Sequence, residues 1–523
     1  MASGQTQKPR TSAGDEAIAV VSPRALDNLF QATEPITADN VDRYRSSPQD
    51  IAATRDEMRK LGFRVVQEGE TTISIAGPPK RFKEVFGIAL KKEARPLSER
   101  APEHTVEFFA PDVAEPEQHL LEAPEQLTPL LDGVAMARPP EIHESPIPPL
   151  APVDPAAYQY LRVPDDVALV IRATRAHRLG ATGQGVVVAM IDTGHYSHPW
   201  FGYHGFRVLT TLLGPGEADP SQDTYGHGTG ESANIFSAAP DCRLRPIKGL
   251  SDPTGSFNVA MASTPRPKVI SNSWGYNIDY PGASLDPYLK TLEAAVANAV
   301  ASGIVVCFSA GNGGQGFPAC MPDVVAVGGV HVNYPGLGLE ASSYASSFDS
   351  SLYPGRHVPD LCGITGKAVT IAGSAKAPSH LLPVQPGSTL DGIEPSTGAA
   401  DDGWGLFSGT SAACPLVAGV VALMLGKAPA KTPGEIKTAL VNSAMDVKVG
   451  STAQGDTAGP GWDNATGAGL VDAKYAWLIT MGDLAAAFFA APPAEQVQMV
   501  QSGQMPQLTA EFTEDVITTL RSR

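Results

Sequence analysis

The chain has 523 residues, of which 42% are hydrophobic and 18% are charged, so it can bury a large core and is long enough for more than one domain. Its formal net charge of −17 argues against nucleic acid and anionic membranes as partners. Five cysteines are too few, and odd in number, for a disulfide framework. Neither a CxxC nor an HExxH motif occurs, so we predict no metal centre.

The N-terminal sequence MASGQTQKPRTSAGDEAIAV has no apolar segment of the kind found in secretory signals. We therefore expect a cytoplasmic protein, or one that is released by a route that the sequence does not reveal. We also expect no apolar segment of about 18 residues, the length that a membrane-spanning helix needs.

The pattern of strand and helix signals over residues 16–139 predicts a small α+β domain of the split βαβ, ferredoxin-like type. Serine and proline before a periodic segment predict a helix start, and glycine after it predicts the end. Strands alternate with two such helices, and the expected elements are a strand at 18–21, a helix from Ser47-Pro48 to Gly62, strands at 63–67 and 72–75, and a helix from Pro79 to Gly87.

Three further regions follow this domain. Residues 140–158 are rich in proline and predict an extended linker. Residues 159–480 have the composition of a large globular domain, interrupted by a Gly-, Ser- and Pro-rich segment at 364–403 that we interpret as an inserted surface loop near the functional site. The tail at 481–523 has a helical pattern, and its function cannot be read from the sequence.

Four short motifs in the large domain carry polar residues at the ends of predicted elements. Asp192 ends the apolar strand of VVVAMIDTG, and Asn312 follows the apolar strand of VVCFSAGN. Such runs are typical of buried parallel strands, whose carboxyl ends form the site edge of an α/β sheet. His227 lies in YGHGTG before a helical stretch at 232–238, and Ser411 lies in FSGTSAACP, where Pro415 indicates that a helix begins nearby.

These residue types fit nucleophilic catalysis. A serine hydroxyl becomes a nucleophile when a neutral imidazole takes its proton, and a buried carboxylate holds the imidazole in the required orientation. Ser411, His227 and Asp192 are the candidates for these roles. The Asn312 amide and the Ser411 backbone N–H are the candidate donors to the negative oxygen that forms during attack.

The order Asp192, His227, Asn312, Ser411, each in its motif, resembles the catalytic domain of the subtilisin-like serine peptidases, over residues of about 160–480. The resemblance implies an α/β fold, a parallel sheet with helices on both faces, and polypeptide substrates cleaved without a cofactor. It also implies that VISNSWG (269–275) pairs with the substrate backbone as an added strand. The first specificity pocket would then lie between Ser273, Trp274 and Gly275 on one side and Ala310 and Gly311 on the other.

The segment GWDNATGAGLVDA (461–473) resembles the closing segment of the family. Asp463, Asn464 and Asp472 could ligate a structural calcium ion there, although a solvated turn is the favoured interpretation.

The N-terminal domain resembles the propeptide of the sedolisin and kumamolisin peptidases, in SPQDIAATRDEMRKLGFRVV and RFKEVFG. This resemblance implies a zymogen whose own propeptide is a partner of the catalytic domain. We expect self-processing between about Ala137 and Tyr158, because the proline-rich linker can reach the cleft.

Two alternatives stay open beside this hypothesis. A sedolisin-type acid peptidase would use carboxylates where this chain has His227 and Asn312, and Glu231, one helical turn after His227, is the acidic residue that could face the site. We favour a buried, hydrogen-bonded role for Glu231. The other alternative is a catalytically silent or permanently inhibited protein that holds peptides in its cleft.

Overall fold

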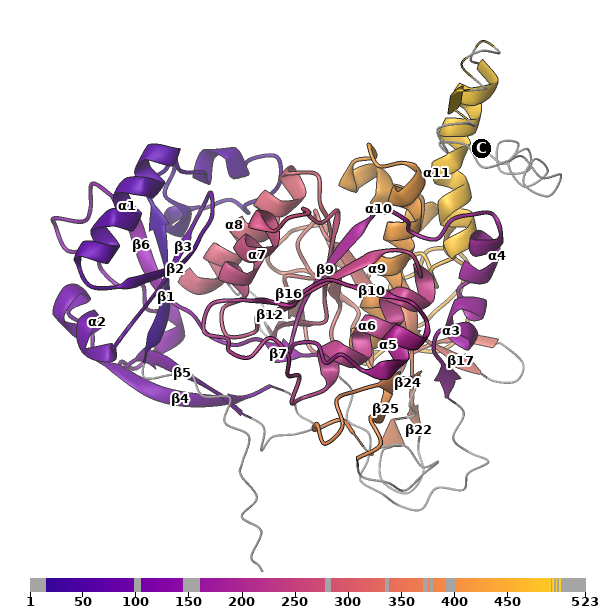
Figure 1. Ribbon diagram of the computed structural model, residues 1–523, viewed down its shortest axis with the longest axis horizontal. Coiled ribbons are helices and arrows are strands. Elements are labelled where there is room, and N and C mark those ends of the chain that lie inside the picture. The colour runs from indigo at the N-terminus through magenta and orange to yellow at the C-terminus, as the bar shows by residue number, and fades with distance from the viewer. Residues whose placement is uncertain are drawn as a thin grey trace, which may run out of the picture.

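The computed structural model describes residues 16–97, 105–143, 160–277, 284–333, 338–369, 375–376, 380–391 and 401–490, and a few positions between 492 and 499. Two lobes lie side by side, with the N-terminal lobe at the left of Figure 1 and the larger lobe at the right. Most of the predicted linker, parts of the inserted segment and most of the tail beyond residue 490 lie outside the described residues.

The N-terminal lobe is a four-stranded antiparallel sheet with two helices. The strand order is β2 (Arg64–Glu68), β3 (Ile73–Gly77), β1 (Ala17–Pro23), β6 (Leu131–Met136). Alternate residues of a strand point to opposite faces of the sheet. Ala17, Ala19 and Val21 accordingly pack with residues of α1 (Pro48–Lys60) and α2 (Pro79–Phe86), whereas Val20 joins the core of the larger lobe. The sheet is therefore buried on both faces.

The helix ends of this lobe follow from local chemistry. The Ser47 side chain accepts the Asp50 N–H at 3.2 Å, and Pro48 occupies the first turn of α1, where no N–H is needed. α2 ends at Gly87, whose φ of 72° is left-handed and suits glycine. The hairpin of β4 (Leu90–Pro96) and β5 (Thr105–Pro111), at the bottom of Figure 1, was not expected, because its residues are mostly partly exposed and carry little hydrophobic pattern.

The larger lobe is built on a mostly parallel sheet. Its order is β10 (Arg207–Val208), β12 (Arg243–Lys248), β9 (Val187–Asp192), β13 (Val269–Asn272), β15 (Val305–Ser309), β17 (Val325–Asn333), β18 (Gly338–Ala341), with β11 (Leu212–Leu213) beside β12 and β21 (Leu361–Thr365) beside β17. Only the β17–β18 pair among these is antiparallel. The predicted α/β class with a parallel sheet is confirmed.

Helices cover both faces of this sheet. α6 (His227–Ala238) and α9 (Thr410–Lys427) pack against each other on one face, and α7 (Pro253–Ala262) and α8 (Pro287–Ala301) lie on the side of the N-terminal lobe (Figure 1). α10 (Pro433–Ser443) and α11 (Ala473–Ala490) pack against each other and, through α11, against α9. The short helices α3 (Asp165–Val170) and α4 (Ala173–Arg178) lie at the right edge in Figure 1, whereas α5 (Pro199–Tyr203) packs against α6 through Phe201 and Phe236.

The expectation that no 18-residue apolar segment exists is wrong. In the described part of the chain, α9 has the length and composition to cross a membrane, with a mean hydropathy of 1.5 over 18 residues, yet 89% of it is buried inside the protein. Its hydrophobicity is that of a central core helix, which is apolar on all sides because other elements surround it.

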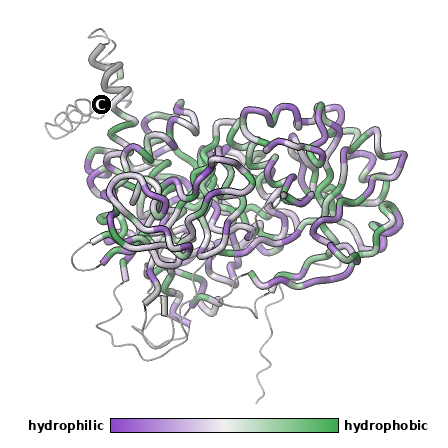
Figure 2. The backbone as a smooth tube through the Cα atoms, turned by 180° about the vertical axis from the view of Figure 1, so that it is seen from behind, coloured by the Kyte–Doolittle hydropathy of each residue, from purple (hydrophilic) through white to green (hydrophobic). Residues whose placement is uncertain are grey.

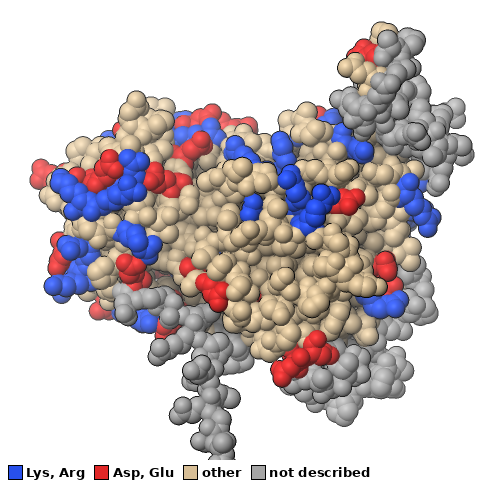
Figure 3. All heavy atoms as spheres, in the orientation of Figure 1, with Lys and Arg blue, Asp and Glu red and all other residues tan. Residues whose placement is uncertain are grey.

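Apolar and charged residues are distributed differently over the two lobes. Figure 2 shows hydrophobic residues along the inner elements, and hydrophilic residues along the outer turns. In Figure 3, charged side chains of both signs gather on the N-terminal lobe, whereas the visible face of the larger lobe is mostly uncharged.

The inserted segment is not simply a surface loop. Its described part contains β24 (His380–Pro383), which pairs with β25 (Trp404–Phe407) and β8 (Leu161–Arg162), and His380 is buried. The Thr389 and Leu390 N–H groups donate to the carbonyls of Thr224 and Tyr225, so this segment packs beside the turn that precedes α6. A four-residue strand is too short to give a recognisable alternation in the sequence.

Candidate active site

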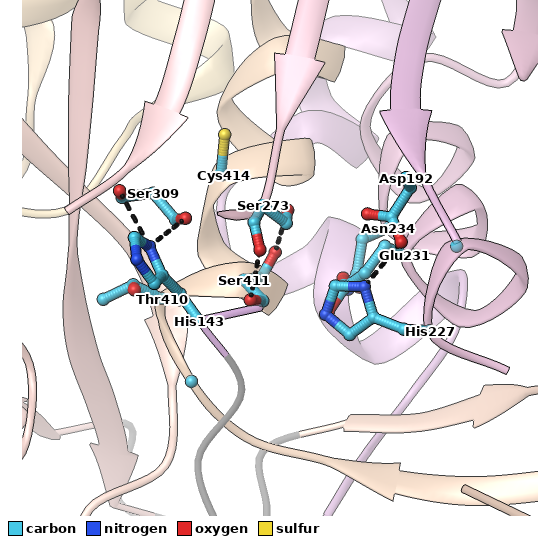
Figure 4. Close-up of polar contacts among 12 residues, drawn as sticks. His143, Asp192, His227, Glu231, Asn234, Ser273, Ser309, Thr410, Ser411 and Cys414 are labelled. Atoms are coloured by element: carbon cyan, nitrogen blue, oxygen red, sulfur yellow. Dashed lines mark hydrogen bonds and ion pairs between the residues drawn. The ribbon is translucent and has the colours of Figure 1, made fainter. Parts of the chain in front are cut away.

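The polar residues of the four motifs meet at one edge of the parallel sheet. Asp192 ends β9, Ser273 follows β13, and Asn312 follows β15. Parallel strands present their carboxyl ends at the same edge, which brings these residues together. His227 and Ser411 reach the same edge from the N-terminal ends of α6 and α9, which pack against each other (Figure 4).

Asp192 and His227 form a buried pair. The His227 Nδ1 lies 2.8 Å from Asp192 Oδ1, which also accepts the Thr193 N–H at 2.7 Å. The side chain of His227 is completely buried, and that of Asp192 is nearly so. α6 begins at His227 itself, not at Ser232 as the sequence indicated, because Gly226 takes a left-handed φ of 95° that turns the chain into the helix.

Glu231 lies on the next turn of α6 and is completely buried. Its Oε2 accepts a hydrogen bond from Asn234 Nδ2 at 2.8 Å, which is the role that the sequence favoured. Its Oε1 lies 3.8 Å from His227 Nε2, so the same carboxylate also faces the site (Figure 4).

Ser411 is held at the start of α9 by Ser273. The Ser411 hydroxyl donates to the Ser273 carbonyl at 3.1 Å, and the Ser273 hydroxyl donates to the Ser411 carbonyl at 2.9 Å. Pro415 lies beyond the first turn of α9, later than expected. Because proline has no N–H, it leaves the carbonyl four residues earlier, that of Ser411, without its helical donor, and Ser273 supplies one instead.

The Asn312 side chain has a fixed orientation. Its Oδ1 accepts the Thr410 N–H at 3.0 Å and lies 3.2 Å from the Thr410 hydroxyl. The amide nitrogen therefore points the other way, where it donates to the carbonyl oxygen of His143 at 2.6 Å. Thr410 was not singled out in the sequence, because its contact with Asn312 joins segments 98 residues apart.

A short strand of the N-terminal region occupies the cleft. β7 (Glu141–Ile142) pairs antiparallel with β14 (Trp274–Asn277), and the His143 N–H donates to the Ser273 carbonyl at 3.2 Å. The Ser411 N–H donates to the His143 carbonyl at 3.2 Å, so this oxygen accepts from Ser411 and Asn312 together. Residues 141–142 are thus part of a sheet and His143 continues along the cleft, whereas the sequence indicated a linker from residue 140.

The His143 ring is buried in a pocket between β14 and β15. A Cβ at Gly275 would lie 2.6 Å from His143 Cε1, and one at Gly316 would lie 3.5 Å from the same atom. His143 Nδ1 lies 2.8 Å from the Ser309 hydroxyl and 3.3 Å from the Ser309 carbonyl oxygen. Burial lowers the pKa of the His143 imidazole to about 4, so the ring is neutral near neutral pH.

The five residues predicted to line this pocket differ in whether they contact His143. Ser273 and Gly275 contact His143. The Trp274 side chain instead packs in the core, where its indole N–H donates to the Ile191 carbonyl at 2.8 Å. The Ala310 carbonyl oxygen would lie 3.0 Å from a Cβ at Gly316, and the Gly311 N–H donates to the Thr410 hydroxyl at 3.1 Å. Sequence reasoning missed Ser309 and Gly316, although Ser309 immediately precedes the predicted pair Ala310 and Gly311.

The candidate calcium ligands make protein contacts of their own. Asp463 accepts the backbone N–H groups of Gly459 and Thr466 at 2.9 and 2.8 Å, as a turn carboxylate does. Asp472 pairs with Arg172 at 2.6 Å and caps α11 through the Tyr475 N–H. Among the described residues, no group of three or more His, Cys, Asp or Glu side chains has a spacing that could hold a metal ion.

Comparison with known proteins identifies the larger lobe. Residues 183–469, more than half of the chain, match the model of the subtilase family. Subtilisin E of Bacillus subtilis is 30% identical over 310 residues, which cover 56% of this chain and 68% of the relative. Subtilisin Savinase of Lederbergia lenta is 28% identical over 322 residues, covering 58% of this chain and 96% of the relative. The structure of fervidolysin, a keratinolytic enzyme from Fervidobacterium pennivorans related to subtilisin, has a TM-score of 0.52 at 19% identity, over 88% of this chain and 61% of that one.

These relatives correct the expected location. Subtilisins and fervidolysin are secreted extracellular proteases, so the cytoplasmic location expected from the N-terminal sequence is wrong. The lack of an apolar segment in the N-terminal sequence describes only the composition of those residues. It carries no conclusion about where the folded protein acts. The resemblance of the N-terminal lobe to sedolisin propeptides stays a prediction.

The fold, the arrangement of the four motifs and the family match point to one conclusion. The sheet edge holds a buried Asp–His pair and a serine at a helix start, as acyl transfer requires. The chain belongs to the subtilase family of serine-type endopeptidases.

Proposed function

We propose that the chain is a zymogen that hydrolyses peptide bonds through an acyl-enzyme on Ser411, with His227 as the base and Asp192 as the residue that orients it. The observation that supports this most directly is the position of the His143 carbonyl oxygen. It accepts hydrogen bonds from the Ser411 N–H and the Asn312 amide, the two groups expected to hold the oxygen of a bond under attack.

In the first step, the Ser411 hydroxyl turns from the Ser273 carbonyl towards His227, whose Nε2 takes its proton. The serine oxygen attacks the substrate carbonyl carbon, and the carbonyl oxygen becomes negative between Ser411 N–H and Asn312 Nδ2. Asp192 stabilises the imidazolium through Nδ1. When the C–N bond breaks, His227 gives its proton to the leaving amine, and the acyl-enzyme remains.

In the second step, a water molecule gives a proton to His227 and attacks the acyl carbon. The same two donors hold the oxygen again. The ester bond breaks, the Ser411 oxygen takes the proton back from His227, and the new carboxylate leaves. All of these groups belong to the chain, in keeping with a family that needs no cofactor for its chemistry.

The cleft strand supports the zymogen part of the proposal. β7 pairs with β14 in the manner of an added substrate strand, and His143, the residue after β7, lies at Ser411. Cleavage of the bond after His143 lies within the interval of about Ala137 to Tyr158 expected from the sequence. The N-terminal lobe would remain as an inhibitor until β7 leaves the cleft.

The test compares wild type with Ser411→Ala by intact mass and by peptide hydrolysis. Wild type is expected to give a fragment of residues 1–143, and Ser411→Ala is expected to stay whole and to lose about a million-fold in turnover. Circular dichroism of the variant controls for folding. A wild-type chain that hydrolyses peptides but stays uncut would contradict self-processing alone. A chain that neither cuts itself nor hydrolyses any peptide would favour the permanently inhibited alternative.

A further inference from the structure

The His143 imidazole makes a specific contact at the bottom of the cleft. Its Nδ1 lies within hydrogen-bond distance of both the hydroxyl and the carbonyl oxygen of Ser309, at 2.8 and 3.3 Å. Ser309 is fully buried, and it is the last residue of β15. The Ser309 carbonyl oxygen can only accept a hydrogen bond, whereas the Ser309 hydroxyl can donate or accept one. An N–H at His143 Nδ1 can therefore bond to either oxygen.

The other walls of the pocket fit a flat, neutral ring. Gly275 and Gly316 bring only backbone to the ring, and a Cβ at Gly275 would lie 2.9 Å from His143 Nε2. Nε2 is buried and has no hydrogen-bond partner among the described residues. An imidazolium would bury a second N–H there without an acceptor, which is costly, whereas the neutral ring places only a lone pair at that position.

From this geometry we propose that Ser309 makes the enzyme selective for substrates with a neutral histidine immediately before the cleaved bond, and that the bond between His143 and Glu144 is the first such substrate. The proposal rests on the proposed function, because it uses the same cleft, nucleophile and oxyanion donors. Ser309 does not touch the reacting atoms, so its role is to select and position the ring.

An apolar side chain of similar size would fit the space but would leave the Ser309 hydroxyl and carbonyl buried without a partner. A site that hydrogen-bonds one substrate group rejects an analogue without that group more strongly than a purely apolar pocket does. Asparagine places an amide near the position of Nδ1 and should be partly accepted. We therefore expect the order His, then Asn, then Leu and Phe.

The surroundings of the ring also make this selectivity depend on pH. β14 and β15 face it with Gly275 and Ser309, and the titratable group on α6 that acts on it, His227, lowers the pKa of His143 further when charged. A free histidine side chain titrates near pH ~6.5. Below that pH most of the substrate molecules have a protonated histidine side chain, and the pocket does not accept the charged ring.

The experiment measures kcat/KM for peptides with the sequence of residues 138–147 and His, Asn, Leu or Phe in place of His143. At pH 8 we expect kcat/KM for the His peptide to exceed kcat/KM for the Leu peptide by about ten- to a hundredfold. The Ser309→Ala substitution should bring the two values to within about threefold of each other. Ser263→Ala, at the end of α7 and remote from the cleft, is the matched control and should keep the ratio. Between pH 8 and pH 5.5 the ratio should fall about tenfold, while the titration of His227 cancels because both peptides share it.

The possible outcomes distinguish a failure of the proposed function from a failure of the proposed histidine selectivity. Hydrolysis of no peptide by wild type would contradict the proposed function. Hydrolysis in which Leu or Phe equals or exceeds His, or a His-to-Leu ratio that Ser309→Ala leaves unchanged, would overturn the selectivity and leave the serine peptidase mechanism in place.

Discussion

In the proposed mechanism, the amide of Asn312 is already oriented as an oxyanion donor before a substrate oxygen reaches it. Thr410 holds Oδ1 with its backbone N–H, so the donor end points into the cleft without reorganisation. A donor fixed in this way stabilises a developing negative charge better than one that must first turn. Thr410 and Ser411 are neighbours, so one helix start positions both of the proposed oxyanion donors.

Asn312→Ala should reduce kcat by roughly a hundred- to a thousandfold with little change in KM, because the Ser411 N–H remains as the second donor. Steady-state kinetics of the purified variant provide the measurement. Turnover within twofold of wild type would show that the oxyanion forms elsewhere.

Two carboxylates flank the His227 ring, and the proposed mechanism assigns them different roles. Asp192 bonds to Nδ1, whereas Glu231 lies 3.8 Å from Nε2 and is held by Asn234. We expect Glu231→Gln, which keeps the shape and the Asn234 contact, to retain substantial activity. His227→Ala should lose it, because no neutral imidazole remains to take the serine proton.

The pH profile of kcat/KM distinguishes the two possible bases. A histidine base works only when neutral, so the rate should fall about tenfold per pH unit in acid and reach a plateau in neutral or mildly alkaline solution. An acidic optimum, with an active His227→Ala and an inactive Glu231→Gln, would instead identify a sedolisin-type acid peptidase.

At the scale of elements, the break at Ser273 divides one sequence motif between two sheets. β13 ends at Asn272 inside the parallel sheet, and β14 begins at Trp274 in the small sheet that holds β7. The Ser273 carbonyl, between them, accepts both His143 N–H and the Ser411 hydroxyl. The sequence indicated one strand over 269–275, because an apolar run does not show where hydrogen bonds change partner.

Gly275→Ala should exclude the His143 ring from its pocket, because the added Cβ would lie 2.6 Å from His143 Cε1. We expect slower self-processing and at least a tenfold loss in kcat/KM for a peptide with histidine before the cleaved bond, with a smaller loss for alanine there. Time courses by mass spectrometry and peptide kinetics measure both. Equal losses for the two peptides would indicate a general distortion of β14.

The sequence predicted local features well and long-range contacts poorly. α1 and α2 start where Ser47-Pro48 and Pro79 indicated, because a helix start is decided by the few residues around it. The local motifs likewise predicted that Asp192 and Asn312 follow strands and that Ser411 lies near a helix start, which is where the structure places them. The His143–Ser309 contact spans 166 residues, and nothing near either residue distinguishes it from an ordinary polar residue.

At the scale of the molecule, the two lobes share a polar and apolar interface. Ser74 donates to Asp252 at 2.7 Å, and Asn258 donates to Thr72 at 3.0 Å, while Arg138 pairs with the buried Asp286. Asp252 and Asp286 also cap α7 and α8, so the N-terminal lobe contacts residues that begin two helices of the larger lobe. Arg138 lies three residues before β7, so its ion pair with Asp286 anchors the chain just before it enters the cleft.

Occupation of the cleft by β7 should weaken in acid. The pKa of His143 is lowered to about 4 in the pocket, against ~6.5 for a free side chain, so its contribution to docking is complete above ~6.5 and is lost as pH falls towards 4. In full-length Ser411→Ala, hydrogen-exchange protection of β7 and β14 should fall about fivefold from pH 6.5 to 5.5, after correction for intrinsic rates.

The double variant Ser411→Ala/His143→Asn is the control for this measurement. It lacks the titrating ring but retains Asp252 and Asp286, whose pKa values burial raises, so their contribution appears in both proteins. A protection that decreases equally in both would exclude His143 as the titrating group.

The strand β7 also decides how the activity should depend on protein concentration. While residues 1–143 are covalently joined to the rest, the cleft and its occupant belong to one molecule, and their encounter has a fixed effective concentration that dilution cannot change. Once the bond after His143 is cut, the same contacts become a bimolecular complex, and the occupied fraction follows mass action. The uncut chain would thus be insensitive to dilution and the cut chain sensitive to it, so release into a large volume would itself act as an activating signal.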